Sequence, residues 1–174
     1  MTGPLERFAR WLRPDRFEEH IYNVKAAELR EKGISAVILD LDNTFLPWKS
    51  SEIPERNLQW AESLRSEGIR LFVLSNTTKP RRMEDICRRI NAGWLHPAAK
   101  PAKKSFLRAA ELLGLPPREI AVAGDQLFTD MLGGRRAGMY LILVKPLSET
   151  EFFGTRYISR PAERLVKKYM ASPF

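Results

Sequence analysis

The stretch Val37-Ile38-Leu39-Asp40-Leu41-Asp42-Asn43-Thr44 decides how this sequence folds. It opens with an apolar, partly β-branched run, which favours a buried strand, whereas Asn43 and Thr44 favour a turn. Because open α/β sheets bind ligands at the carboxyl ends of their strands, Asp40 and Asp42 are candidate functional residues. The turn can reorient the second acid, so the two carboxylates can take separate roles, as phosphoryl or glycosyl transfer requires. Sugar-binding clefts are usually lined with aromatic side chains. This chain has only four tryptophans, scattered along the sequence, and their small number argues against such a cleft.

Strands and helices alternate on both sides of this stretch. The pattern predicts strands at 34–39, 70–74, 119–123 and 140–144, with helices at 54–67, 81–90, 103–113 and about 130–137. Helices at 4–13 and 24–32 precede the first strand, and a last helix is expected at 161–170. We therefore expect an α/β fold, a three-layer αβα sandwich around a parallel Rossmann-like sheet. Residues 1–33 form an N-terminal helical segment and 34–174 the sheet domain, within a single domain overall.

Composition and charge limit the class of protein. The chain has 174 residues and 44% hydrophobic content, enough for one core. Its lone Cys87 cannot form an internal disulfide, and the longest apolar run, Met139–Val144, is too short to cross a bilayer, so we expect a cytoplasmic protein. The net charge is +8, and residues 70–110 carry ten basic and two acidic side chains. Such a field attracts a phosphorylated molecule, nucleic acid or an anionic membrane.

Polar residues stand just after a predicted strand or at the start of a predicted helix. Since parallel strands end at one edge of a sheet, we expect these residues to meet in one cleft. They are Asp40 with Asp42, Ser75 with Asn76, Lys100, and Asp125 with Asp130.

These residues occur in motifs that resemble a known family. Asp40-Leu41-Asp42-Asn43-Thr44, Leu74-Ser75-Asn76, Lys100-Pro101 and the run from Gly124-Asp125 to Asp130 are similar, in order, to the four motifs of the haloacid dehalogenase-like (HAD) hydrolases. The likeness covers roughly residues 34–145. The helix leading into Gly33 and the run Gly-Asp-Gln-Leu-Phe-Thr-Asp resemble more closely subfamily IIIA and its YqeG-type phosphatases, which are similar to phosphatidylglycerophosphate phosphatases.

The resemblance implies a phosphomonoester hydrolase that forms an aspartyl-phosphate. Asp40 would be the nucleophile, and Asp42 would protonate the leaving alkoxide and later activate water. Ser75 and Asn76 would bind the substrate phosphoryl group. Lys100 would neutralise both that group and Asp40.

The resemblance also implies Mg²⁺ as cofactor. Its ligands would be a carboxylate oxygen of Asp40, the main-chain carbonyl of Asp42, and Asp125. Asp130 would contact the metal through a water molecule or support the direct ligands from behind.

The spacing of the motifs bears on the substrate. Thr44 to Ser75 spans 31 positions and Ser75 to Lys100 spans 25, too few for the cap domain that many relatives insert there, so we expect a capless, open site. An open mouth suits a phosphate carried on something large. We expect a basic rim made of Arg81, Arg82, Arg88, Arg89, Lys103 and Lys104.

The first expected helix bears on the partner. Leu5, Phe8, Ala9 and Leu12 form an apolar stripe opposite basic residues, so residues 4–13 either contact a membrane from the cytoplasmic side or pack on protein. The YqeG-type resemblance implies phosphatidylglycerophosphate as the preferred substrate, with this stripe and the basic rim contacting anionic lipid. Two alternatives stay open: a phosphatase for another metabolite, a nucleic-acid end or a phosphoprotein, and a basic nucleic-acid- or ribosome-associated module with little catalysis. Nucleic acid is the less favoured partner because no familiar RNA-binding motif is present.

Overall fold

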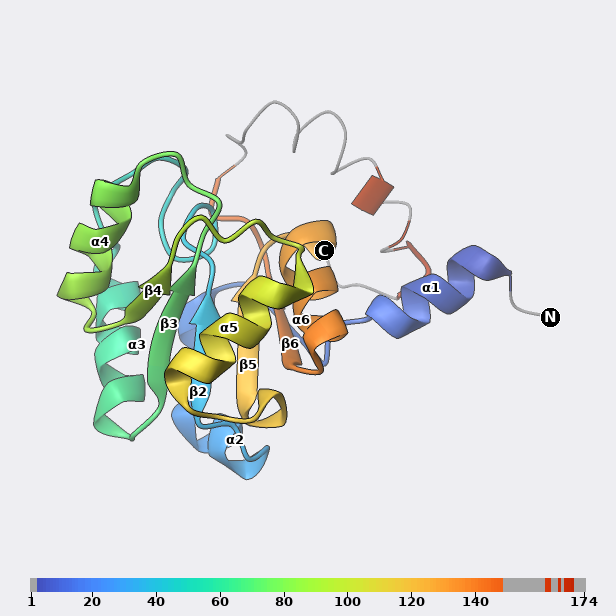
Figure 1. Cartoon of the computed structure of the whole chain (residues 1–174), viewed down its shortest axis with the longest axis horizontal. Helices are drawn as coiled ribbons and strands as arrows, with labels where there is room; N and C mark the ends of the chain where they lie inside the picture. The colour runs from blue at the N-terminus through green and yellow to red at the C-terminus, as the bar shows by residue number, and fades with distance from the viewer. Residues whose placement is uncertain (1–2, 149–161, 164–165, 167, 171–174) are drawn as a thin grey trace.

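A six-stranded, all-parallel sheet forms the centre of the protein (Figure 1). The structure is a computed structural model and describes residues 3–148, 162–163, 166 and 168–170. The sheet order is β1-β6-β5-β2-β3-β4. The strands are β1 (Arg16–Glu18), β2 (Ala36–Leu39), β3 (Arg70–Leu74), β4 (Gly93–Leu95), β5 (Ile120–Gly124) and β6 (Tyr140–Val144). The strand order reverses at β2, next to β5 and β3, which is where such sheets place a ligand.

Helices cover both faces of the sheet, as expected for a three-layer sandwich. One face is covered by α2 (Ala26–Glu31), α3 (Glu55–Ser66) and α4 (Pro80–Arg89). The other is covered by α5 (Lys103–Leu113) and α6 (Leu132–Ala137), and Ala9 and Leu12 of α1 (Pro4–Leu12) belong to the same apolar cluster. Short 3₁₀ turns occur at Ile21–Asn23 and Pro117–Glu119, and a π-helical turn at Leu127–Met131 leads into α6. Among the described residues, no helix has the length and apolar character needed to span a bilayer.

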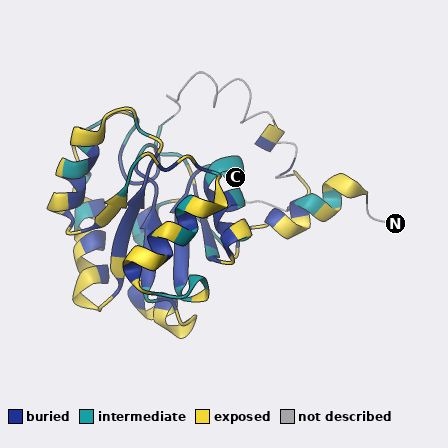
Figure 2. Ribbon diagram, viewed as in Figure 1, coloured by how far each residue is buried: buried dark blue, intermediate teal, exposed yellow. Residues whose placement is uncertain are grey.

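Alternate residues of each central strand point to opposite faces and separate two apolar clusters. Val37 and Leu39 of β2 pack in the first cluster, whereas Ala36 and Ile38 pack in the second. All four are at most 1% exposed, and Figure 2 shows the central strands as a continuous buried layer. A strand buried on both faces reads as an unbroken apolar run, which is why residues 36–39 could be recognised from sequence.

Two strands were not predicted, and both lie at sheet edges. Strand β1 pairs with β6 and β4 with β3, each over three residues. Arg16 and Glu18 of β1 are only partly buried and pair with each other at 2.6 Å, and Trp94 of β4 is 39% exposed. Short, half-exposed strands lack the apolar run on which the prediction relied. The N-terminal segment, expected to be helical, therefore also supplies a strand.

The connections around the site are short. Residues 44–75 hold only α3 and β3 as regular elements, and residues 75–100 hold only α4 and β4. The capless architecture is therefore confirmed for these two insertion points. Of the expected last helix, 161–170, the described residues 162–163, 166 and 168 are helical and 169–170 form a turn. The sequence also predicts a loop at 146–157, of which 149–157 lie outside the described residues.

Candidate active site

A cavity of about 410 Å³ opens at the carboxyl ends of the central strands. Five residues singled out in the sequence line it: Asp40, Asp42, Ser75, Asn76 and Lys100. Beneath them lie Asp125 and Asp130, which are 0% and 1% exposed. The structure thus brings together all the predicted site residues, because β2, β3 and β5 end at the same edge of the sheet.

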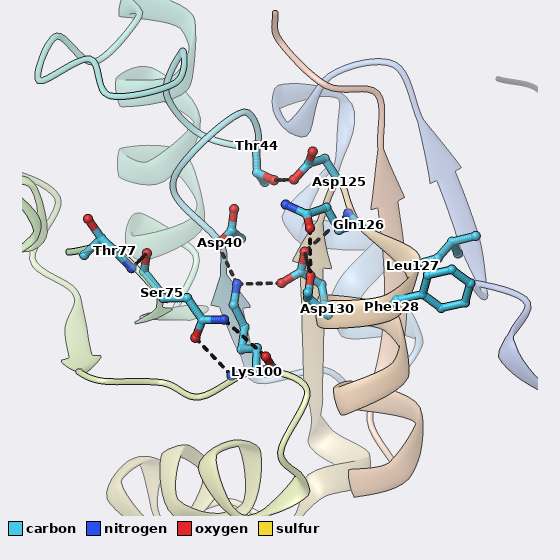
Figure 3. A network of polar contacts seen from close by, with 12 residues as sticks. Asp40, Thr44, Ser75, Thr77, Lys100, Asp125, Gln126, Leu127, Phe128 and Asp130 are labelled. Carbon is cyan, nitrogen blue, oxygen red and sulfur yellow. Dashed lines mark hydrogen bonds and ion pairs between the residues drawn. The ribbon is translucent and has the colours of Figure 1, made fainter. Parts of the chain in front are cut away.

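The floor of the cavity is a buried ionic network (Figure 3). Lys100 Nζ donates to Asp40 Oδ1 at 2.5 Å and to Asp130 Oδ1 at 2.6 Å. All three side chains are less than 10% exposed. Buried charges are tolerated only when they are paired in this way, so the network fixes the direction in which Asp40 points.

Three carboxylates of this floor can hold a metal ion. One ligand oxygen each from Asp40, Asp125 and Asp130 lies within 4.8 Å of the others. Thr44 Oγ1 donates to Asp125 Oδ1 at 3.2 Å and orients that carboxylate. All-oxygen ligands suit a hard divalent cation. The residues therefore fit the metal that the resemblance implies, with Asp42 set apart because its carboxylate is outside this group.

A glycine makes the close approach of these acids geometrically feasible. A Cβ on Gly124, the last residue of β5, would lie 2.3 Å from Asp130 Cγ. No side chain fits there, so only glycine lets Asp130 reach Lys100 over the end of the strand. Main-chain N–H of Gln126 and the hydroxyl of Thr129 complete the hydrogen bonds of Asp130 Oδ2, at 3.3 and 3.4 Å.

Burial sets the protonation of the network. It raises the pKa of Asp40 to about 8; the Lys100 ammonium opposes this rise, and the charges of Asp130 and Asp125 add to it. Burial lowers the pKa of Lys100, but Asp130 and Asp40 outweigh it, so the net pKa of Lys100 is raised and the group stays charged. A divalent cation beside Asp40 would supply the positive charge that favours its reactive carboxylate form.

Asp42 has a different set of partners from Asp40. Its Oδ1 accepts from Arg82 Nη2 at 2.9 Å and from the Lys49 main-chain N–H at 2.9 Å, and its Oδ2 accepts from Arg82 Nη1 at 3.1 Å. Asn43 has φ 65°, a left-handed conformation that asparagine tolerates, and this turn separates the two acids. The two carboxylates therefore lie in different surroundings.

Ser75 and Asn76 follow the carboxyl end of β3 and make different hydrogen bonds. The Ser75 hydroxyl accepts from the main-chain N–H of Thr77 at 3.2 Å and keeps its own proton for another acceptor. Asn76 Oδ1 accepts from the Lys100 N–H at 3.0 Å, and Asn76 Nδ2 donates to the Lys100 carbonyl at 3.2 Å. Asn76 therefore positions Lys100, in addition to lining the cavity.

The expected basic rim differs from the observed one. Of the six side chains named from sequence, only Arg82 lines the cavity; the others, in the described part of the chain, lie outside its lining. Arg88 instead pairs with Asp85 at 2.8 Å, and Arg89 donates to the Ser51 carbonyl. Lys49 and Lys79 take their place in the lining. The helix period of α4 turns most of its arginines away from the opening, which a count of charge could not reveal.

Sequence reasoning also missed a contact from far along the chain. Glu163 is 1% exposed, and its Oε1 accepts from the main-chain N–H groups of Leu127 and Phe128 at 2.8 and 3.4 Å. It thus satisfies the amino-terminal end of the turn that carries Asp130. A lone glutamate in an expected terminal helix carries no sequence signal for such a role.

The sequence is similar to those of known proteins. The family model of the haloacid dehalogenase-like hydrolases matches residues 7–138. The chain is 34% identical over 153 residues to Probable phosphatase YqeG of Bacillus subtilis (strain 168), covering 88% of each. It is also 30% identical over 111 residues to the N-acylneuraminate-9-phosphatase of Rattus norvegicus, covering 56% of this chain and 44% of that protein.

Solved structures agree on the fold. An uncharacterized protein from Listeria monocytogenes serotype 4b matches with a TM-score of 0.53 at 17% identity, over 78% of this chain and 99% of that one. A HAD phosphatase from Thermococcus onnurineus matches with a TM-score of 0.50 at 21% identity, over 59% of this chain and 51% of that one. The family match spans most of the sequence and includes the motifs that build the cavity floor. The chain therefore belongs to the haloacid dehalogenase-like hydrolases, within their YqeG-type phosphatase branch.

Proposed function

We propose that this protein is a Mg²⁺-dependent phosphatase whose substrate is phosphatidylglycerophosphate, which it hydrolyses to phosphatidylglycerol. The observation that carries the phosphatase assignment is the placement of Asp40. It lies at the base of an open cavity, held by Lys100 at 2.5 Å and close to two further buried carboxylates. This is the arrangement expected when a carboxylate must attack phosphorus while fixed charges stabilise the transferred group.

The residues divide the reaction into two displacements. In the first, an Asp40 oxygen bonds to phosphorus while the ester P–O bond breaks, and Asp42 gives its proton to the departing alkoxide. In the second, water attacks the same phosphorus, Asp42 takes the water proton, and Asp40 and phosphate are released. Lys100 and the Ser75 hydroxyl stabilise the phosphoryl oxygens throughout. Mg²⁺ bound by Asp40, Asp125 and the Asp42 main-chain carbonyl, with Asp130 behind, would neutralise charge on the phosphoryl group.

The open site supports a large substrate. No cap covers the cavity from the two short connections, 44–75 and 75–100. The cationic side chains of Lys49, Lys79 and Arg82 line its opening. A phosphomonoester at a membrane surface could reach Asp40 from outside without any part of the lipid having to be enclosed.

The first helix supports contact with the cytoplasmic face of a membrane. Ala9 and Leu12 of α1 are fully buried, whereas Leu5 and Trp11 are 36% and 47% exposed beside several arginines. An exposed tryptophan among basic residues favours the interface of an anionic bilayer. The helix ends next to the start of β6, where Asp15 N–H donates to the Leu141 carbonyl, whereas the cavity lies at the carboxyl ends of the central strands. Membrane contact and substrate choice therefore need separate tests.

The decisive experiment is Mg²⁺-dependent phosphate release from phosphatidylglycerophosphate in mixed micelles, beside a panel of soluble phosphoesters. We expect preferential lipid turnover that is lost in Asp40→Asn. To test docking, Leu5→Ser with Trp11→Ser leaves the buried face of α1 intact. Slower turnover on anionic vesicles with unchanged turnover of soluble esters would support docking, and unchanged turnover on both would contradict it.

A soluble metabolite is the second candidate substrate. The relative named N-acylneuraminate-9-phosphatase supports it, since the shared segment here aligns with a phosphatase named for a sugar phosphate. Turnover of soluble esters alone would favour this candidate, and a nucleic-acid end or a phosphoprotein is tested in the same panel. Absence of turnover throughout, together with salt-dependent RNA binding that Asp40→Asn leaves unchanged, would favour a nucleic-acid- or ribosome-associated module instead.

A further inference from the structure

A residue from the last described part of the chain contacts the turn that carries Asp130. Glu163 Oε1 accepts from the main-chain N–H of Leu127 at 2.8 Å and from that of Phe128 at 3.4 Å. The glutamate is only 1% exposed, yet it lies beyond residue 138, where the match to the family model ends. A part of this chain outside the shared motifs therefore adds this contact to the site.

The same turn supplies Asp130 to the floor of the cavity. Leu127–Met131 is a single π-helical turn, and its fourth residue is Asp130. Asp130 Oδ1 accepts from Lys100 Nζ at 2.6 Å, and Asp130 Oδ2 accepts from the Gln126 main-chain N–H at 3.3 Å. Figure 3 shows Asp130 pointing from this turn towards Lys100. Glu163 thus binds the first two N–H groups of the segment whose fourth side chain enters the ionic network.

The turn has little room to shift without moving Asp130. A Cβ on Gly124 would lie 2.3 Å from Asp130 Cγ, so the carboxylate is packed directly against the end of β5. Leu127 and Met131, the two ends of the turn, are both 0% exposed. A buried N–H that loses its acceptor costs folding free energy, so the turn would rearrange to regain one. Such a rearrangement would displace Asp130 from its position between Gly124 and Lys100.

The position of Glu163 suits it to hold the turn and not the ion. Among the described residues, the carboxylates that could share a metal ion are Asp40, Asp125 and Asp130, and Glu163 is outside this group. A carboxylate that accepts from main-chain N–H groups makes charge-assisted hydrogen bonds, which are roughly twice as strong as neutral ones. Any effect of Glu163 on the metal site therefore has to pass through the turn and Asp130.

We infer that Glu163 is a positioning residue for the metal site. By fixing the amino-terminal end of the turn, it keeps the Asp130 carboxylate beside Lys100 and within reach of an ion held by the other two carboxylates. The inference rests on the proposed Mg²⁺-dependent phosphatase and deepens it, because a residue beyond the family match sets the metal affinity of residues within the motifs. Loss of Glu163 then weakens metal binding without removing any ligand.

The first test is calorimetric titration of the natural protein and its variants with Mg²⁺ alone. Glu163→Met removes the acceptor and keeps the length of the side chain, so Kd for Mg²⁺ should rise about 10- to 100-fold, as for other partners that orient a metal ligand. Glu163→Gln keeps an acceptor oxygen without the charge and should raise Kd by only a few fold. Two controls should leave Kd unchanged. Leu29→Ala destabilises the protein from the other apolar cluster, and Glu62→Met makes the same substitution at an exposed position of α3.

The second test asks whether the effect passes through Asp130. The Glu163→Met substitution is repeated in an Asp130→Asn background, where the carboxylate to be positioned is absent. Its effect on Kd for Mg²⁺ should then shrink to roughly twofold or less. In phosphate release from an ester that the natural protein turns over, Glu163→Met alone should need about 10- to 100-fold more Mg²⁺ for half its maximal rate. At saturating Mg²⁺ its kcat should return close to the natural value, which a general loss of structure would not allow.

The outcomes separate this inference from the function on which it rests. A Kd for Mg²⁺ in Glu163→Met within twofold of the natural value overturns the inference and leaves the phosphatase standing. So does an equal rise in Leu29→Ala, since loss of stability is then the cause, and so does an undiminished effect in the Asp130→Asn background. If Glu163→Met does not fold, the smaller rise in Glu163→Gln, and its disappearance with Asp130→Asn, decide the question.

A natural protein that neither binds Mg²⁺ nor turns over any ester overturns the proposed function itself. The inference is then decided by urea unfolding in EDTA, where no metal is involved. If Glu163 positions Asp130, the shifts in unfolding midpoint caused by Glu163→Met and Asp130→Asn should not add, because both act on the same turn. Strict additivity of the two shifts overturns the inference.

Discussion

Replacing Lys100 with methionine should destabilise the protein strongly, because Lys100 is the cation that directly pairs two of the buried carboxylates. Its Nζ lies 2.5 Å from Asp40 and 2.6 Å from Asp130, and the Lys100 side chain is 5% exposed. Methionine keeps the length of the side chain and removes the charge. Breaking a buried pair from one side costs about 3–5 kcal/mol. With a urea m-value of roughly 2 kcal/mol/M, the unfolding midpoint in EDTA should fall by about 2 M.

The double variant with Asp130→Asn isolates the electrostatic cause. Because it removes one of the carboxylates left unpaired by the first change, it should recover about 1 kcal/mol or more relative to Lys100→Met alone. Lys104→Met, an exposed lysine on α5, makes the same charge change and should shift the midpoint very little. A loss below about 1 kcal/mol in Lys100→Met, or strict additivity in the double variant, would refute the reasoning. The rate of phosphate release should fall by about 10²–10³-fold in Lys100→Met.

Gly124, Glu163 and Cys87 provide three local tests. Gly124→Ala places a Cβ 2.3 Å from Asp130 Cγ, so Asp130 must move and Mg²⁺ binding by calorimetry should weaken; Gly3→Ala, with open space around it, should not change binding. Glu163→Met leaves the Leu127 N–H without its acceptor and should cost about 1–3 kcal/mol of unfolding free energy, whereas Glu163→Gln, which still accepts, should cost less; equal losses would contradict this. Burial raises the pKa of Cys87 to about 12, with Glu84 adding to the rise, so roughly one thiol in 10⁴ is ionised at pH 8. Iodoacetamide should therefore label it only in urea, and rapid labelling of the native protein would show the burial to be wrong.

The sequence was sufficient for the central elements of the fold because their signals are local. An unbroken apolar run followed by turn residues located β2, and the same pattern located β3, β5 and β6 with errors of two residues or fewer at each end. The same pattern did not predict the edge strands β1 and β4. Their three-residue pairing depends on the adjacent strand. In β4, for example, Gly93 pairs with Phe72 of β3, and a Cβ on Gly93 would lie 2.8 Å from the Phe72 ring.

For the site, the motifs identified the reacting groups but not the residues that support them. Asp40 and Ser75 were found because each follows a predicted strand at one edge of a parallel sheet, and Lys100 because it precedes a predicted helix. Arg82 was placed on a solvent-facing rim, although it is nearly buried against Asp42. Its side-chain direction depends on the rotation of α4 about its axis, and hence on where Met83 and Ile86 enter the core. Glu163 depends on a contact 36 positions away from Leu127, which no local pattern encodes.

The distribution of charge across the cavity fits the proposed metal ion and a phosphate-bearing substrate. At its base, Asp40, Asp125 and Asp130 face a single cation, Lys100, so full ionisation leaves two negative charges in a buried space. Burial opposes that state and raises the pKa of Asp40, and a divalent cation supplies the missing charge of the matching size. At its mouth the balance is reversed, since the basic residues Lys49, Lys79 and Arg82 are in the lining there and Asp42 is the acid that pairs with Arg82. On the proposed function, a phosphate entering between the two regions would be held by Lys100 and the metal at the base and by the cations of the mouth above.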